Sequence, residues 1–213
     1  IILRSREFCN LSEVVIRSND TMTDIGKKVK RATMLGTIQS TLTNFKYLPR
    51  DWRKNCDEER LLGVSLTGIM DNSLTANPKP ENLRQLREIA VQTNKAFAQE
   101  IGINPSASIT CVKPSGTVSQ LVDSASGIHS RHSPYYIRRV RMDAKDPMTA
   151  FMQDLEWVWE PDNTKPNETV VFSFPVKSPK GSITRDKRSA IQQLEVWALY
   201  QEHWCQHKPS ITI

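Results

Sequence analysis

The chain has 213 residues, of which 38% are hydrophobic and 24% are charged, a balance that is ordinary for a globular protein. No apolar run approaches the roughly 18 residues that a membrane-spanning helix needs, so composition argues against a membrane-embedded class. The net charge of +6 and isoelectric point of about 9.2 permit a polyanionic partner. Because no recognition motif accompanies that charge, nucleic acid is not the expected partner.

Four cysteines are present, and their wide spacing matches neither a metal site nor a compact disulfide framework. This usage indicates a reducing, cytoplasmic location, in which an oxidised cysteine is redox-active rather than structural. The basic N-terminal stretch has too short an apolar block for a signal peptide. Because the chain starts without Met and ends within the strand-like PSITI, we expect a piece of a longer protein, truncated at both ends.

The first half of the chain predicts a strand, a helix, a connection and a second apolar element. Residues 7–16 predict a strand. A helix is expected from Thr21 to about Asn44, and its apolar face would consist of Ile25, Val29, Leu35, Ile38, Leu42 and Phe45. The polar stretch 47–60 is interpreted as an irregular connection. Residues 61–70 predict either a buried strand or the start of a buried helix.

The second half alternates in the same way. A proline can open a helix in its first turn, which predicts a helix from about Glu81 to Ile101. The remaining expected elements are a strand over 106–113, an edge strand over 134–142, a strand over 169–176 that Pro175 ends or places at a sheet edge, a helix from Thr184 to about His203 and a strand over 209–213. Strands that alternate with helices favour an α/β fold with mostly parallel strands.

The stretch KPSGTVSQ, residues 113–120, follows one of these strands directly. Ligands of α/β folds sit beyond the carboxyl ends of the strands. Gly116 lets the backbone approach a ligand closely, and the amides of Ser115, Gly116, Thr117 and Val118 can converge on phosphate oxygens. A plain strand-to-helix turn explains the same composition, and composition alone favours that turn. The stretch lacks the Walker pattern.

Three further features admit both a chemical and a structural interpretation. Cys9 can be a nucleophile, a redox thiol or a core residue, and the core is the default for a free cysteine. His203 and His207 have the spacing of a zinc-binding pair on one helix, but the intervening acid of the metalloprotease motif is missing. The basic stretch 127–141 fits an anion-binding surface, and a solvated loop followed by an edge strand explains it almost as well.

Residues 6–17, 61–71 and 111–141 (REFCNLSEVVIR, LLGVSLTGIMD and CVKPSGTVSQLVDSASGIHSRHSPYYIRRVR) together resemble the catalytic subunit of ribonucleotide reductases. The likeness is greatest to the monomeric, adenosylcobalamin-dependent class II ribonucleoside-triphosphate reductases, and it extends over essentially all residues, 1–213. It implies an α/β fold, namely the second half of a ten-stranded α/β barrel that is built from two five-stranded parallel halves.

The resemblance also implies roles for residues. Cys9 matches a redox-active cysteine whose partner lies in the other half of the barrel, outside this chain. Ser115, Gly116, Thr117, Val118 and Ser119 match the loop that binds the substrate phosphates. The family's radical-bearing cysteine lies in an N-P-C-G-E motif, which would end immediately before Ile1 and is missing here. Individual cobalamin contacts cannot be matched, and no metal-ligating residue is assigned.

The implied reaction replaces the ribose 2′-hydroxyl of a nucleotide with hydrogen, for DNA synthesis. Adenosylcobalamin would start the radical chemistry, and two thiols, one of them Cys9, would supply the reducing equivalents. The implied partners are a ribonucleoside triphosphate, thioredoxin or a similar dithiol, and the N-terminal half-barrel of the same enzyme. The chain alone is expected to be inactive. A class I large-subunit fragment and a basic nucleic-acid-binding module remain the alternatives.

Overall fold

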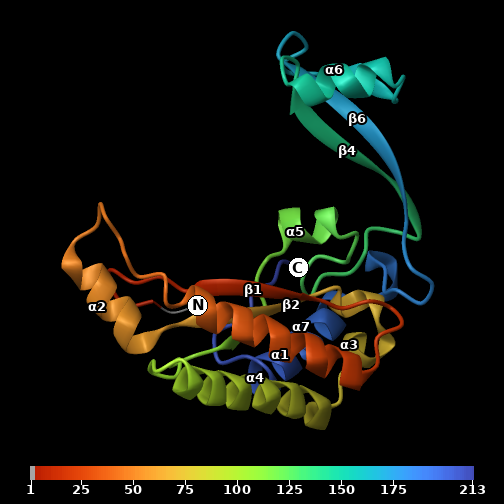
Figure 1. The fold of residues 1–213 in the computed structure, drawn as a ribbon. Coiled ribbons are helices and arrows are strands. Elements are labelled where there is room, and N and C mark those ends of the chain that lie inside the picture. The colour runs from red at the N-terminus through yellow and green to blue at the C-terminus, as the bar shows by residue number, and fades with distance from the viewer. Residues whose placement is uncertain (1–2) are drawn as a thin grey trace. The chain divides into compact units, whose positions relative to one another are not determined.

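The computed structural model describes residues 3–213; Ile1 and Ile2, with which the predicted domain 1–213 begins, lie outside the described residues. The chain divides into two compact units. Unit 1 comprises Ile1–Arg131 and Lys180–Ile213, and unit 2 comprises His132–Pro179. Each unit contains its own three-stranded sheet (Figure 1). No helix in the described part of the chain is long and apolar enough to cross a membrane.

The sheet of unit 1 is parallel, with strand order β1-β2-β3. Its strands are β1 (Asn10–Val15), β2 (Leu62–Thr67) and β3 (Thr110–Cys111). The predicted parallel α/β pattern is therefore confirmed for this unit. The third strand is much shorter than expected because the backbone N–H groups on either side of it donate to side chains. Ile109 N donates to Gln206 Oε1 (2.8 Å), and Lys113 N donates to Ser65 Oγ (3.0 Å).

Two long helices, α1 (Met22–Gln39) and α4 (Pro80–Glu100), lie on the same side of β1 and β2, and the short helix α5 (Gly116–Leu121) lies on the other side (Figure 1). A capping box between Thr21 and Asp24 starts α1. A proline in the first turn starts α4, as predicted. The long helices leave one face of the sheet for the site described below.

The predicted apolar face of α1 is wrong beyond Val29. Leu35 is 65% exposed, and Ile38 and Leu42 are exposed too. Small residues face the sheet instead: Ala32, Thr33, Gly36 and Thr37 are buried. A Cβ atom added to Gly36 would lie in van der Waals contact with Leu62, 3.5 Å away, so the small side chains of this face pack directly on β2. A search for large apolar residues misses such a face.

The polar stretch 47–60 is a second error of the sequence analysis, because it contains the helix α2 (Arg50–Glu59). Pro49 precedes the helix in an extended conformation. Only Cys56 of this helix is buried, so the sequence shows no apolar stripe that would reveal it. Trp52 stacks on Phe8, with ring centroids 4.6 Å apart, and this contact fixes the segment that leads to Cys9.

The rest of unit 1 consists of η1 (Ile69–Asp71), α3 (Ser73–Ala76), η2 (Arg185–Lys187) and α7 (Ala190–His203). The last predicted helix is therefore confirmed, although it starts later than expected. The predicted strand over 209–213 is not formed as a strand. Ser210 N nevertheless donates to Val112 O (2.9 Å), so this segment runs along the free edge of β3.

A buried ion pair joins η1, which follows β2, to the segment after α5. Arg131 donates through Nε and Nη2 to the two carboxylate oxygens of Asp71, each at 2.9 Å, and both side chains are 3% exposed. The same carboxylate accepts bonds from Ala125 N (2.7 Å) and Ser182 Oγ (3.0 Å). These bonds hold three separate segments of the chain together below the loop that begins at Lys113.

Unit 2 is an antiparallel sheet of order β4-β6-β5 with one helix. Its elements are β4 (Tyr135–Asp143), α6 (Pro147–Asp154), β5 (Trp159–Pro161) and β6 (Thr169–Lys177). The predicted edge strand is confirmed as β4, and the expectation of parallel strands is wrong for this unit. Pro175 of β6 lies after the residues of β6 that pair with β5. Its missing N–H therefore removes no hydrogen bond between β6 and β5.

Candidate functional site

One face of the parallel sheet carries the candidate site. Side chains alternate along a strand, so Cys9, Leu11 and Glu13 share one side of the chain around β1. Leu11 is opposite Gly63 in the register with β2, and Ser65 is opposite Cys111 in the register with β3. These residues therefore face the same side, opposite to the side that α1 covers.

Gly63 lies at the centre of this face and makes room for two thiols. A Cβ atom added to it would lie 2.4 Å from Leu11 Cδ2, 3.2 Å from Cys9 Sγ and 3.3 Å from Cys111 Sγ. Both sulfur atoms therefore approach the same point above β2. Any larger residue at position 63 would displace Leu11 and crowd the thiols.

A cavity of about 610 Å³ lies on the same face, where the loop after β3 turns over the sheet. The strands contribute Leu11, Ser12 and Glu13 from β1 and Ser65 from β2. The loop contributes residues 113–118. Leu11 thus touches both the cavity and the space around the Cys9 thiol, which makes the two features neighbours on one surface.

Four of the five residues predicted to bind phosphate line this cavity: Ser115, Gly116, Thr117 and Val118. The fifth, Ser119, does not line it, because its fully buried hydroxyl donates to Ser115 O and to Gly116 O. The amides at the start of α5 have no acceptor within the helix, so they are available to a ligand. No atom lies within 4 Å of a Cβ added to Gly116, which leaves open space above the loop.

Two charged side chains of opposite sign, Glu13 and Lys113, line the cavity. Ser115 Oγ donates to Glu13 Oε2 (2.6 Å), which joins the loop to β1. Burial raises the pKa of Glu13, and the bond from Ser115 opposes that rise. No ion pair of Glu13 or Lys113 is found within the part of the chain that the structure describes.

The Cys9 thiol is held in its neutral form. Burial raises its pKa to about 11, and the positive charge of Lys113 acts in the opposite direction. Burial likewise raises the pKa of Cys111 to about 12. A neutral thiol is a poor nucleophile, but it can give up both a proton and an electron. The site therefore favours redox chemistry at Cys9 over direct nucleophilic attack at neutral pH.

A disulfide between Cys9 and Cys111 does not fit this sheet. Because β2 lies between β1 and β3, residues on the outer strands are roughly 9.6 Å apart across the sheet. A disulfide needs Cα atoms about 4.4–6.8 Å apart. All four cysteines of the chain are free. A disulfide between Cys9 and Cys111 would therefore require a movement of the backbone.

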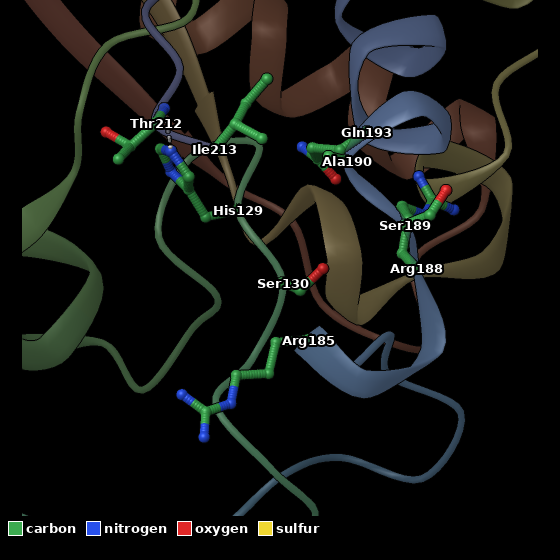
Figure 2. A pocket seen from close by; sticks show the side chains of 9 residues that line it. All are labelled: His129, Ser130, Arg185, Arg188, Ser189, Ala190, Gln193, Thr212 and Ile213. Carbon is green, nitrogen blue, oxygen red and sulfur yellow. Dashed lines mark hydrogen bonds between the residues drawn. The ribbon is translucent and has the colours of Figure 1, made fainter.

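A second cavity, of about 330 Å³, lies at the start of α7 (Figure 2). His129 Nε2 accepts a bond from Thr212 N (2.9 Å), and its Nδ1 lies 3.0 Å from Ser126 O. Arg188 Nη2 donates to Ala76 O (3.0 Å), and the Arg185 guanidinium points away from the other lining residues in Figure 2. We assign no ligand to this cavity.

Three of the four arginines in the basic stretch 127–141 are paired with carboxylates. Arg131 is engaged by Asp71, while Arg139 pairs with Glu160 and Arg141 with Asp162. The interpretation as a loop followed by an edge strand is therefore the better one.

The histidine pair does not have the geometry of a zinc site. Helix α7 ends at His203, so His203 and His207 do not share a helix face. His207 is buried, its Nε2 lies 2.9 Å from Leu62 O, and burial lowers its pKa. No group of three or more His, Cys, Asp or Glu side chains with the geometry of a metal site occurs among the described residues.

Sequence reasoning missed Glu13, Gly63 and Ser65 as members of the site. The alternation of β1 offered a signal for Glu13, since it lies four residues after Cys9 on the same face. Gly63 and Ser65 carry no such signal, because their place depends on the register between strands that are far apart in the sequence.

No family model matches the chain. Curated proteins of known name are nevertheless similar to it. The adenosylcobalamin-dependent ribonucleoside-triphosphate reductase of Lactobacillus acidophilus is 29% identical, over 100% of this chain and 32% of the relative. The protein of the same name from Euglena gracilis is also 29% identical, over 99% of this chain and 29% of the relative. The chain thus spans about a third of the length of these relatives. Their names do not favour the class I or nucleic-acid-binding alternatives.

A crystal structure of a B12-dependent (class II) ribonucleotide reductase superimposes on the chain with a TM-score of 0.80. The two sequences are 23% identical, and the match covers 99% of this chain and 33% of the other. The predicted fold class, part of the reductase α/β barrel, is therefore confirmed. Over its whole length, the chain is a relative of the adenosylcobalamin-dependent ribonucleoside-triphosphate reductases and corresponds to about one third of such a protein.

Proposed function

We propose that this chain is part of an enzyme that reduces ribonucleotides, preferably triphosphates, to 2′-deoxyribonucleotides for DNA synthesis. All of its residues, 1–213, would belong to the catalytic barrel domain, in the second half-barrel. The observation that carries the proposal is the common face of the sheet: the Cys9 thiol and the loop at 115–118 lie at opposite ends of one surface that Leu11 bridges.

In this proposal, Cys9 is one of two thiols that supply the reducing equivalents. The substrate loses its 2′-hydroxyl as water, and the two thiols lose two electrons and two protons as they form a disulfide. The raised pKa of Cys9 supports this role, because the thiol keeps its proton until the reaction uses it. Because β2 separates Cys9 from Cys111, the second thiol of the disulfide is expected to come from the other half of the barrel.

The loop after β3 would hold the substrate phosphates. The amides at the start of α5, the hydroxyl of Thr117 and the charge of Lys113 all line the cavity and suit a polyanion. Ser119 would support the loop from below through its bonds to Ser115 O and Gly116 O and would not touch the phosphates. Fixing the phosphates places the ribose over Leu11 and towards Cys9, and small misplacements are costly in such chemistry.

Adenosylcobalamin, which the names of the relatives include, would supply the initiating radical. The residues of the described cavity do not fit this group, because about 610 Å³ accommodates the ribose and phosphates but not a corrin ring with its side chains. We therefore assign the cavity to the nucleotide and no residue of this chain to the cofactor.

Three partners follow from the proposed reaction. The N-terminal half-barrel would contribute the second redox thiol, and the segment just upstream of this chain would contribute the radical-bearing cysteine. Thioredoxin or a similar dithiol would reduce the disulfide by thiol exchange. A reducing compartment such as the cytoplasm suits the four free cysteines.

Reconstitution tests the proposed function. The chain is mixed with an upstream piece that carries the N-P-C-G-E motif, and adenosylcobalamin, ribonucleoside triphosphates and a dithiol are added. We expect deoxynucleotide to form in the complete mixture and not with either piece alone, as measured by chromatography of the nucleotides. A folded, associated mixture that forms no deoxynucleotide would contradict the proposal.

A further inference from the structure

The carboxylate of Glu13 lines the cavity beside the loop to which the proposed function assigns the phosphates. Glu13 lines the cavity from β1, and its Oε2 accepts the hydroxyl bond of Ser115 at 2.6 Å. Ser115 itself is only 4% exposed, so this bond is largely shielded from solvent. The contact spans 102 positions of the sequence, and it links the strand that follows Cys9 directly to the loop.

The groups around Glu13 do not neutralise it. From the loop, Lys113 lines the same cavity without forming an ion pair with it. Helix α5, with the sequence GTVSQL, contributes no charged side chain. On the sheet face, Cys9 and Cys111 stay neutral up to about pH 11 because burial raises their pKa values. An arriving phosphate would therefore be repelled by an ionised carboxylate that forms no ion pair with Lys113.

We propose that Glu13 couples anion binding at this loop to proton uptake: the carboxylate holds Ser115 when the cavity is free of anions, and it takes up one proton when a polyphosphate binds. This inference deepens the proposed function and rests on it. The protonated carboxyl no longer repels the phosphate, and its O–H becomes a donor to a phosphate oxygen. Ser115 Oγ is then free to donate to the ligand as well.

The sign of the effect follows from the direction of the pKa change. Burial already raises the pKa of Glu13 in the free chain, and a bound polyphosphate raises it further. At a pH between the pKa of Glu13 in the free chain and its pKa in the complex, each binding event takes up a proton from solvent. The affinity for the anion therefore falls as the pH rises through this interval, by roughly tenfold per pH unit at most. Above the bound pKa, the affinity no longer changes through Glu13.

Titration calorimetry with inorganic tripolyphosphate tests the inference on this chain, on Glu13→Gln and on Glu100→Gln between pH 5 and pH 8. Glu100 is exposed on α4 and controls for the loss of one negative charge. The ligand's own protonation is the same in all three titrations and cancels in the affinity ratios. We expect Glu13→Gln to bind about tenfold more tightly than the unsubstituted chain at pH 8, and the advantage to shrink at pH 5. Glu100→Gln should follow the unsubstituted chain.

A second measurement needs no variant. The ¹³C resonance of the Glu13 side-chain carboxyl, followed against pH, should titrate at a higher pH with saturating tripolyphosphate than without it. An unmoved midpoint, or equal pH dependence in Glu13→Gln and the unsubstituted chain, overturns the inference and leaves the phosphate loop intact. If no protein binds tripolyphosphate at any pH, the proposed phosphate loop itself is wrong, and the inference is overturned with it.

Discussion

Cys9→Ser is expected to stop dithiol-coupled turnover in the full-length enzyme, with a loss on the order of 1,000-fold or more, because one of two electron-donating groups is removed. Serine keeps the size of the side chain and cannot form a disulfide. Radical formation should persist, since it requires the cysteine of the N-P-C-G-E motif and not Cys9. The readouts are deoxynucleotide formed per minute with the dithiol present and the radical signal by electron paramagnetic resonance in the same samples.

Cys56→Ser is the matched control. Cys56 is buried in α2 and accepts a bond from Phe8 N at 3.4 Å, a role that a serine oxygen can also fill. It lies neither at the cavity nor beside Gly63, where the Cys9 and Cys111 thiols meet, so turnover should be retained. Normal dithiol-coupled turnover in Cys9→Ser would show that the role given to Cys9 is wrong, whatever the control does.

Asp71→Asn is expected to destabilise unit 1 by about 3 kcal/mol or more, because it removes the buried carboxylate that faces Arg131. The amide keeps the size of the side chain but cannot accept both guanidinium bonds and those from Ala125 N and Ser182 Oγ. The free energy of unfolding from urea titration, followed by circular dichroism, measures the effect.

Asp123→Asn supplies the comparison for this ion pair. Asp123 also contacts Arg131, at 2.8 Å, but its side chain is 66% exposed, so the loss should stay below about 1 kcal/mol. Its backbone has a φ of 45°, which asparagine tolerates well. Equal losses in the two variants would mean that the buried carboxylate has no special part in holding these segments together.

Local sequence patterns were sufficient to predict elements that carry their own start signal or alternation. The helix from Pro80 to Glu100 carries its starting proline, and the edge strand from Tyr135 to Asp143 carries a clear alternation. The loop at 115–119 was found because small hydroxyl residues follow an apolar strand. Its assignment to phosphate came from the family resemblance, since composition alone favoured a plain turn.

The features that sequence did not predict depend on contacts between distant segments. Helix α1 faces the sheet with Gly36 and small neighbours because the strand Leu62–Thr67 lies so close to it. The bond between Glu13 and Ser115 requires the register of three strands to be known. The antiparallel sheet of unit 2 follows from the pairing of β4 with β6, which alternation within either strand does not specify.

Protection of Cys9 from alkylation tests the central claim, that its thiol and the loop serve one nucleotide. The chain is treated with iodoacetamide at pH 9, where a small thiolate fraction of Cys9 reacts, with and without each ribonucleoside triphosphate. Labelling at Cys9 is followed by mass spectrometry. At ten times its dissociation constant, at least one nucleotide should slow this labelling roughly tenfold, since only the free form reacts. A nucleotide that calorimetry shows to be bound, while Cys9 is labelled at an unchanged rate, would contradict the account.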